Sequence, residues 1–237
     1  DRPLYKTGHS KHFSPTPLCV TEPTDQIILS IETAVAGGSL ALYRNGGALA
    51  EMSGDAQISR AADLLPNIDK LLQSNNLELR DIGSIAVSLG PGSYTGIRIG
   101  IATALGLARS VDLIIKGVSH LKAIAADAST DGRVIAAVPI GREDIAWQVF
   151  DNGSPVTEPR VGSFDDLIAA LSDLHGPATF HHYGLSDRLN AIGNALNVTT
   201  PDLSLAALIA SAAARGHAEP HLAPIYLINP ARSRNLF

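Results

Sequence analysis

The apolar positions at the start of the patterned part of the chain predict three consecutive β-strands. Ile27 to Ile31 is a short apolar run rich in β-branched residues, which is typical of a buried strand. Ser39 to Tyr43 alternates as a second strand, and Ala48 to Ser53 returns as a third. The dipeptide Asn45-Gly46 between the last two is a strong hairpin signal. We therefore expect the core to begin with antiparallel strands.

The rest of the chain alternates between helical and strand patterns. From Ile58 to Leu72, apolar residues recur at three- and four-residue steps, which predicts a helix with an apolar stripe wide enough to contact more than its own sheet. Further strands are predicted at Ile82 to Leu89, Leu113 to Val118, Val134 to Val138, Ile145 to Phe150 and Ala178 to His182, and further helices at Ile97 to Ser110, His120 to Ala128, Phe164 to Leu174 and Leu203 to Arg215. This order predicts an α/β fold with mixed sheets in two lobes.

The chain divides into segments of different character. We expect residues 26–111 to form a first lobe, residues 112–202 to form a second, and residues 203–229 to return to the first. Residues 1–25 mix Pro, His, Ser, Thr and both charge signs without periodicity, and they contain no apolar stretch of the kind that a secretory signal needs. We interpret them as a non-core N-terminal extension.

Composition narrows the function classes. Hydrophobic residues make up 45% of the 237 residues and charged residues 17%, so a packed core is expected rather than disorder. The net charge of −5 argues against a protein that holds nucleic acid by its own field. Cys19 is the single cysteine, which excludes an internal disulfide and fits a reducing compartment. The longest uncharged stretch of small and apolar residues, about Leu203 to Ala214, is shorter than the ~20 residues that span a bilayer, so we expect a cytoplasmic protein.

The most informative motif is the run from Gly90 to Gly100, which follows a predicted strand and leads into a helix. Its three leading glycines and a proline predict a tight turn, and the helix start that follows offers backbone N–H groups to an anion. The spacing is neither that of a dinucleotide-binding turn nor that of a P-loop. The sequence leaves a purely structural turn and a phosphate cradle equally open. The anion-binding candidates are Gly90, Gly92, Ser93, Thr95 and Gly96.

The helix after this turn carries small residues four positions apart, at Gly96, Gly100, Ala104 and Ala108. Small side chains on one face let another backbone approach closely. The stripe therefore predicts either tight packing on the chain's own sheet or a seam with a partner helix, and composition does not separate the two.

Other candidates for chemistry favour ordinary structural roles. Glu32 follows the first strand and is interpreted as a solvated or capping residue, because no phosphate turn adjoins it. Arg98 lies in a first helical turn, where a cation is disfavoured, so we expect a salt bridge there or a role at an interface. The histidine pairs give no credible three-ligand metal site, and no catalytic residue is assigned.

Together, Ile31 to Ala34, Ser39 to Leu42, Leu65-Pro66 and above all Gly90 to Gly100 resemble the TsaB family. Gly117 to Ser119 and Pro224 to Leu227 extend the resemblance, which covers about Ile27 to Leu227. TsaB is the bacterial partner subunit in the synthesis of tRNA threonylcarbamoyladenosine. The resemblance implies the two-lobed fold of the actin-like ATPases, which sugar kinases share.

The resemblance also implies a non-catalytic role for the chain. It would dock to and activate a TsaD-type threonylcarbamoyltransferase, with a TsaE-type ATPase also joining, and contact tRNA only through that complex. ATP and metal are expected on the partner subunits and no cofactor on this chain; a homodimer of the isolated chain stays open. The helices of the first lobe would form the interface, through Leu64, Leu65, Ile68, Leu72, Gly96, Arg98, Gly100, Ile101 and Ala104.

The sequence departs from the family pattern in three places, one of which is Ile58-Ser59, where the family often opens its first helix with His-Thr or His-Ser. Glu32 stands where the family usually has Asp, and Pro139 to Ala146 replaces the usual second-lobe stretch, keeping only Asp144 and Arg142 of its chemistry. A competing hypothesis is an ATP-dependent kinase or transferase of the sugar-kinase type. That hypothesis is disfavoured because the first strand lacks the expected Asp-Gly-Thr phosphate turn.

Overall fold

The first sheet contains the predicted hairpin at its edge. A computed structural model describes residues 25–54, 60–128, 130–174, 176–186 and 196–227. Within them the first sheet has the strand order β3-β2-β1-β4-β5. Its strands are β1 (Ile27–Glu32), β2 (Ser39–Arg44), β3 (Gly47–Ser53), β4 (Ile82–Ser88) and β5 (Ile114–Val118). The first three pair antiparallel, whereas β4 and β5 continue the sheet in parallel.

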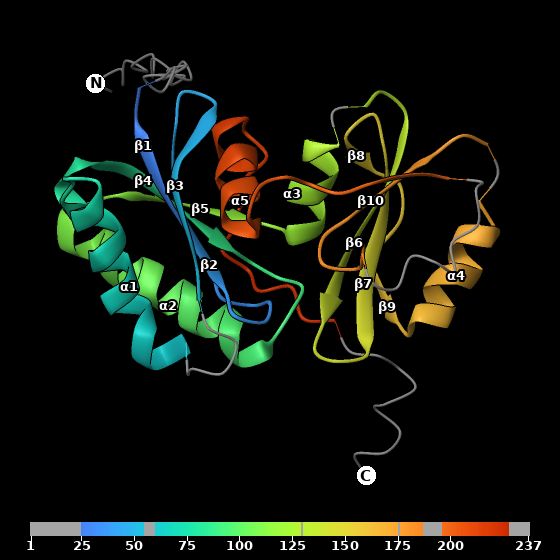
Figure 1. Cartoon of the computed structure of the whole chain (residues 1–237), viewed down its shortest axis with the longest axis horizontal. Helices are drawn as coiled ribbons and strands as arrows, with labels where there is room; N and C mark the ends of the chain where they lie inside the picture. The colour runs from blue at the N-terminus through green and yellow to red at the C-terminus, as the bar shows by residue number, and fades with distance from the viewer. Residues whose placement is uncertain (1–24, 55–59, 129, 175, 187–195, 228–237) are drawn as a thin grey trace, which may run out of the picture.

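Helices cover both faces of this sheet (Figure 1). Helices α1 (Arg60–Ser74) and α2 (Tyr94–Val111) pack on one face, and α5 (Leu205–Ala214) packs on the other. Because successive side chains of a strand point to opposite faces, Leu29 and Ile31 join the core beneath α1 and α2, while Ile28 joins the core beneath α5. Strand β1 is therefore buried on both sides, which explains its continuous apolar run.

The second sheet has the order β11-β10-β6-β7-β8, and a further strand, β9, also pairs with β7. Its strands are β6 (Arg133–Ile140), β7 (Asp144–Asp151), β8 (Ser154–Pro155), β9 (Arg160–Gly162), β10 (Thr179–His182) and β11 (Asn197–Thr199). Helix α4 (Phe164–Ser172) covers one face of it through Leu167 and Leu171. Trp147 is buried in the same cluster, so it is a core residue.

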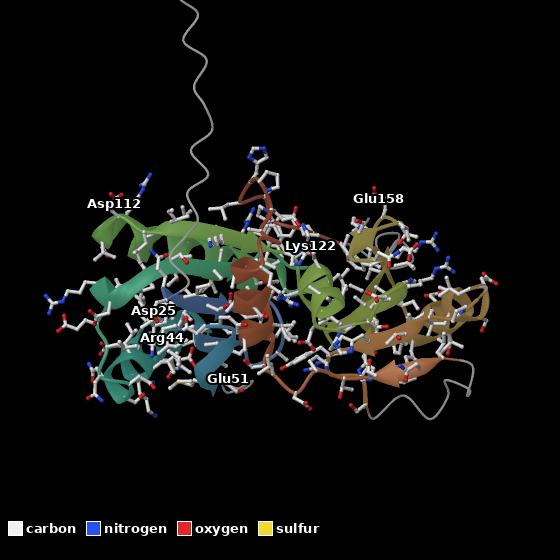
Figure 2. All side chains as sticks on the ribbon, turned by 90° about the horizontal axis from the view of Figure 1, so that it is seen from above. Asp25, Arg44, Glu51, Asp112, Lys122 and Glu158 are labelled. Atoms are coloured by element: carbon white, nitrogen blue, oxygen red, sulfur yellow. The ribbon has the colours of Figure 1, made fainter. Side chains whose placement is uncertain are left out.

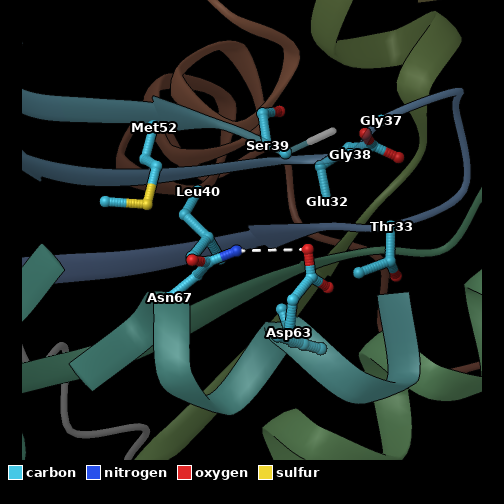
Figure 3. Close-up of a pocket in the computed structure, with 11 residues that line it drawn as sticks. Glu32, Thr33, Gly37, Gly38, Ser39, Leu40, Met52, Asp63 and Asn67 are labelled. Atoms are coloured by element: carbon cyan, nitrogen blue, oxygen red, sulfur yellow. Dashed lines mark hydrogen bonds between the residues drawn. The ribbon is translucent and has the colours of Figure 1, made fainter. Parts of the chain in front are cut away.

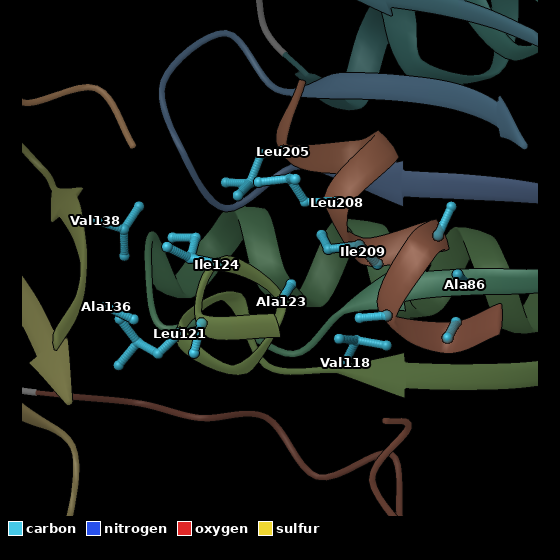
Figure 4. Close-up of a cluster of buried hydrophobic side chains, with 14 of the residues drawn as sticks. Ala86, Val118, Leu121, Ala123, Ile124, Ala136, Val138, Leu205, Leu208 and Ile209 are labelled. Atoms are coloured by element: carbon cyan, nitrogen blue, oxygen red, sulfur yellow. The ribbon is translucent and has the colours of Figure 1, made fainter. Parts of the chain in front are cut away.

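Two helices join the lobes. Helix α3 (His120–Asp127) packs against both β6 and α5, and a continuous apolar cluster runs from one sheet to the other (Figure 4). Leu121 and Ile124 of α3 lie between Val138 of the second sheet and Leu208 of α5 in this cluster. The α5 segment therefore belongs to the first lobe and helps to fix the second lobe against it.

The structure corrects several sequence-based boundaries. Strand β5 pairs with β4, so the lobe boundary predicted near Val111 lies after Val118 instead. Helix α2 begins at Tyr94 rather than Ile97, because the Ser93 side chain caps it by accepting a hydrogen bond from the Gly96 amide at 3.2 Å. Strands β8, β9 and β11 were not predicted because each has only two or three residues.

Some predictions lie outside the described residues. These are the N-terminal extension up to residue 24 and the predicted helix start at Ile58. The short helix η1 (Leu79–Asp81), which leads into β4, was also not predicted. None of the described helices combines the length and apolar character needed to cross a membrane.

Candidate functional site

The glycine turn and the start of α2 lie directly on the loop that follows β1. The Ser93 amide donates a hydrogen bond to the Ala34 carbonyl at 2.8 Å. The Thr33 hydroxyl donates to the Gly96 carbonyl at 2.7 Å, and that bond is buried. Thr33 and Gly96 are 63 residues apart in the sequence, so their hydrogen bond joins two distant segments of the chain.

The glycines of the motif are required because these two backbones approach so closely. A Cβ on Gly92 would lie 2.7 Å from the Ala34 carbonyl oxygen. A Cβ on Gly96 would overlap the Thr33 carbonyl oxygen, and one on Gly100 would overlap the Thr33 hydroxyl. The small-residue stripe of α2 therefore packs on its own chain, which decides the alternative that the sequence left open.

This packing corrects most of the predicted partner interface. Six of the predicted interface residues are buried against the chain's own first sheet. They are therefore not accessible to a partner while the chain has this fold. They are Leu64, Ile68, Leu72, Gly96, Gly100 and Ala104. Three predicted residues are accessible: Leu65 and Arg98 are exposed, and Ile101 is half-buried.

Behind the turn lies a buried polar cluster of Glu32, Ser88 and His120. His120 Nδ1 donates to the Pro91 carbonyl at 2.8 Å, because a carbonyl oxygen only accepts. Its Nε2 lies 2.6 Å from Ser88 Oγ and 3.4 Å from Glu32 Oε1. All three side chains are almost completely buried. Ser88 and His120 were not predicted as site residues, because the cluster is assembled from three elements that are far apart in the sequence.

Glu32 is thus buried and not solvated. Its carboxylate accepts hydrogen bonds from the Ala34 and Val35 amides, the second at 2.9 Å. The capping part of the sequence interpretation is confirmed and the solvated part is wrong. The carboxylate holds the β1–β2 loop in the shape that receives Ser93 and Gly96.

Three amides of the proposed anion turn donate hydrogen bonds to partners within the chain. The Gly90 amide donates to Ser88 Oγ at 3.1 Å, the Ser93 amide to Ala34, and the Gly96 amide to Ser93 Oγ. Thr95, another of the candidates, is exposed. These bonds favour the structural interpretation of the turn, and nucleotide binding stays an untested hypothesis.

Two cavities adjoin this region. The first lies between α1 and the β1–β2 loop, is lined by Glu32, Thr33 and Asp63 among others, and has a volume of about 20 Å³ (Figure 3). That volume holds about one water molecule. The second, of about 270 Å³, lies between the lobes, with Pro91 and Ser119 on one side and Phe150 on the other. The first is too small for a nucleotide.

Arg98 contacts two tyrosines instead of the expected salt bridge. Its guanidinium lies 3.9 Å from the centre of the Tyr94 ring, and its Nε donates to the Tyr226 hydroxyl at 3.2 Å. The two rings lie 4.6 Å apart, and the hydrogen bond with Tyr226 raises the pKa of Arg98 above its usual value. Both rings are substantially exposed. Tyr94 and Tyr226 were not predicted as partners of Arg98, although the four-residue step from Tyr94 to Arg98 is visible in the sequence.

One side of α2 therefore forms an accessible stripe, which we call the outer stripe of α2. It consists of Tyr94, Arg98, Ile101 and Leu105, spaced by three and four residues on the side opposite the buried glycines. Leu105 is 40% exposed, and Leu65 on the neighbouring helix α1 is 56% exposed. Large apolar and aromatic side chains together with an arginine are the composition that protein interfaces favour.

Histidines elsewhere take structural positions. His181 lies between Thr199 Oγ1 at 2.8 Å and Asp127 Oδ2 at 3.1 Å, and so connects β10 with β11 and α3. His182 is on the opposite face of the strand, beside the Phe180 ring. Among the residues that the structure describes, no three His, Cys, Asp or Glu side chains are grouped as a metal site would need.

Comparison with known proteins gives one family match and several relatives. Residues 54–225 match the family described as TsaD: tRNA N6-adenosine threonylcarbamoyltransferase. The chain is 36% identical over 128 residues to the tRNA threonylcarbamoyladenosine biosynthesis protein TsaB of Escherichia coli, covering 52% of this chain and 54% of that protein. It is 36% identical over 100 residues to TsaB of Bacillus subtilis, covering 42% and 44%. The matches thus span about half the length of these relatives.

Solved structures extend the likeness to nearly the whole fold. YeaZ from Pseudomonas aeruginosa superposes with a TM-score of 0.60 at 25% identity, covering 85% of this chain and 100% of that one. Component A of the (R)-2-hydroxyglutaryl-CoA dehydratase of Acidaminococcus fermentans gives a TM-score of 0.52 at 11% identity, covering 81% and 100%. At that identity the second likeness concerns the fold alone.

Proposed function

Because this chain belongs to the TsaD family of tRNA N6-adenosine threonylcarbamoyltransferases, and within it to the TsaB proteins with their actin-like ATPase fold, we propose that it acts in the biosynthesis of tRNA threonylcarbamoyladenosine. The support is that the TsaB relatives from Escherichia coli and Bacillus subtilis carry that role in their names. The modified nucleotide would be the adenosine just 3′ of the anticodon.

Within that pathway, the role we propose is that of a non-catalytic subunit that docks to and activates a TsaD-type transferase. The observation that carries it is the outer stripe of α2, which leaves Tyr94, Arg98 and Leu105 accessible beside Leu65 of α1. These side chains are exposed, whereas Ile101 of the same stripe packs partly against the core of the first sheet. Burying them against a partner helix would remove their apolar surface from water.

The geometry behind the turn supports a role without chemistry of its own. Glu32, at the position where actin-like ATPases carry a metal-handling acid, accepts hydrogen bonds from its own loop and is 2% exposed. The cavity beside it holds about one water. ATP, a metal ion and the transferred threonylcarbamoyl group would accordingly be handled by the TsaD-type and TsaE-type partners in the cytoplasm, with tRNA contacted through the assembled complex.

Reconstitution tests this proposal directly. The chain, a TsaD-type subunit and a TsaE-type ATPase from the same source are combined with tRNA, ATP and the threonylcarbamoyl donor. Formation of threonylcarbamoyladenosine should require the chain and should rise with its concentration until the TsaD-type subunit is saturated. Full activity without the chain would contradict the proposed role.

The alternative is an ATP-dependent kinase or transferase of the sugar-kinase type. The observation in its favour is the cavity of about 270 Å³ between the lobes, which has Lys122 in its lining. That lysine is paired with Glu219 at 3.2 Å, so it is not poised for a phosphate. Calorimetric titration of the isolated chain with ATP and Mg²⁺ separates the two functions, because micromolar binding with hydrolysis would favour the kinase.

A further inference from the structure

Helix α5 leaves one end of the first sheet uncovered. Tyr43, Ile28 and Ser84 are register partners on β2, β1 and β4, so their side chains form a row across the face that α5 covers. The next residue of the row, Ile114 on β5, is 62% exposed. Helix α5 ends at Ala214 beside this row. The face is opposite the one on which α1 and α2 pack.

A cavity of about 700 Å³ occupies this uncovered end, within the size range of small-molecule sites. Ile28 and Ala214 form an apolar part of its lining, and most of the other lining residues have polar side chains. The lining residues are Gln26, Ile28, Tyr43, Arg44, Asn45, Gly46, Ser84, Ser211, Ala214 and Arg215. Among the residues that the structure describes, the lining holds two arginines and no carboxylate, although Asp25 lies at its edge beside Arg44, in a chain whose net charge is −5.

The two arginines come from different elements and are held differently. Arg215 caps the end of α5: its Nε donates to the Ser211 carbonyl at 3.4 Å and a terminal nitrogen donates to the Ala126 carbonyl at 2.8 Å. Arg44, at the end of β2, is 3.8 Å from Asp25, and both side chains reach solvent (Figure 2). A pair at that distance and exposure is weak, so Arg44 can turn to another anion.

Ser84 gives an independent indication of a ligand. It is 2% exposed and lines the cavity, yet its hydroxyl has no hydrogen-bond partner among the residues that the structure describes. A buried hydroxyl without a partner is costly, and native structures normally supply one. Tyr43 lies in the same row on the far side of Ile28, and its hydroxyl donates a hydrogen bond to Ser211 Oγ at 3.2 Å.

We propose that this cavity is a binding site for a small organic anion, whose carboxylate or phosphate group is held by Arg44 and Arg215 and whose apolar part lies over Ile28 and Ala214. The Ser84 hydroxyl would complete the polar contacts. The site is separate from the outer stripe of α2 and from the glycine turn, so it stands independently of the proposed role in tRNA modification.

A pair of fluorescent probes tests the proposal on the full chain. 8-Anilino-1-naphthalenesulfonate carries an apolar body and an anionic group, and N-phenyl-1-naphthylamine carries the same body without the charge. The sulfonate should bind saturably with one-to-one stoichiometry, and the uncharged probe about tenfold more weakly or worse. Arg44→Gln should weaken the sulfonate by roughly ten- to a hundredfold, as loss of a charge-assisted hydrogen bond does.

Two further variants are tested with the same probes. Ser84→Ala removes only the unpartnered hydroxyl, so it should leave the thermal melt unchanged or raised and weaken the sulfonate by about three- to tenfold. Arg109→Gln, on α2 at the other face of the sheet, is the matched control and should bind as the wild type does. Equal binding of the two probes, or unchanged binding by Arg44→Gln, would overturn the proposal.

Displacement identifies the anionic group. Hexanoate and adenosine monophosphate are titrated against the bound sulfonate, and displacement by the first or the second assigns a carboxylate or a phosphate ligand. If neither displaces it, the cavity takes the dye through its apolar lining alone and the proposed anion site is wrong.

Discussion

Gly96 shows how closely two backbones meet at the centre of the molecule. Its amide and carbonyl are bonded to Ser93 and Thr33, and the space where a side chain would stand is occupied by the Thr33 carbonyl. A helix interior normally prefers alanine to glycine by about 1 kcal/mol. The glycine is therefore kept here for space and not for helix formation.

Gly96→Ala should destabilise the chain by about 1–3 kcal/mol, because the added methyl forces α2 away from the β1–β2 loop. Thermal melts should record a loss of roughly 2–4 °C per kcal/mol for a chain of this size. Gly106→Ala is the matched control on the same helix, where a Cβ meets nothing within 4 Å, and it should raise the melting temperature slightly. Equal melts for the two variants would contradict the close approach.

The same finding changes how two other substitutions are interpreted. Gly100→Leu, which tests a partner seam if the small-residue stripe faces outward, would overlap Thr33 and report on the folding of this chain. Glu32→Ala, at a residue to which the sequence assigns no chemistry, removes an acceptor from two loop amides. Both substitutions should therefore lower the free energy of unfolding of the isolated chain, without any partner present.

His182 makes the free energy of unfolding depend on pH. It is completely buried, neither ring nitrogen has a partner among the described residues, and burial, with a smaller effect of His181, lowers its pKa to about 4. An unfolded histidine titrates near pH 6.5. Between these values the unfolded chain binds the extra proton, so the free energy of unfolding falls as the pH drops from about 6.5 towards 4.

His182→Leu should therefore lose part of the pH dependence. One proton corresponds to about 1.4 kcal/mol per pH unit, and urea unfolding at several pH values between 4.5 and 7 measures the slope. The variant should be relatively more stable at pH 4.5 than at pH 7 when compared with the wild type. A constant difference between the two proteins over this range would count against a buried neutral His182.

Helix α2 was predicted from the sequence, but which of its faces is buried was not. The four-residue spacing of its small residues was visible, and so were both explanations for it. Only the position of Thr33, far away in the sequence, decides that the glycines face inward. The outer stripe was then missed because Tyr94 and Leu105 look like ordinary helix residues until the opposite face is known to be buried. Tyr226 reaches the stripe from the end of the chain, which no local pattern encodes.

Helix α5 depends on its cap at the end that faces β3. The Ser204 side chain accepts a hydrogen bond from the Ala207 amide at 3.3 Å, and the Ser204 amide donates to Glu51 at 2.8 Å. Ser204→Ala should cost about 1 kcal/mol of unfolding free energy, measured by urea denaturation. Ser204→Asn, which keeps a capping oxygen, should recover most of it. If both variants lose the same amount, the cap is not the source of the effect.

For the whole molecule, most of the architecture was predictable from patterns of period 2 and 3.6. The hairpin, the buried strands and the five α-helices of the described residues were expected, and the TsaB resemblance and the actin-like ATPase fold are confirmed. The lobe boundary was misplaced because pairing of β5 with β4 is a long-range property. The polar cluster of Glu32, Ser88 and His120 was beyond prediction for the same reason.

The isolated chain should bind tRNA poorly. Its net charge is −5, and affinity for nucleic acid depends mainly on cationic contacts with phosphates. In gel shifts at physiological salt, binding should be no tighter than the roughly 10⁻⁴–10⁻⁶ M of non-specific complexes. Submicromolar binding by the chain alone would show that it reaches tRNA without its partners, against the proposed role.

The most direct test of the central proposal is the affinity of the chain for a TsaD-type subunit. Calorimetry measures it for the wild-type chain and for two variants, Leu105→Asp and Val156→Asp. Both residues are exposed, Leu105 on the outer stripe of α2 and Val156 in the second lobe, so neither change should unfold the chain. Docking through the stripe predicts that Leu105→Asp weakens binding by about tenfold or more, as hot-spot residues do, while Val156→Asp binds like the wild type. A folded Leu105→Asp variant with wild-type affinity, or a wild-type chain that does not bind, would contradict the account.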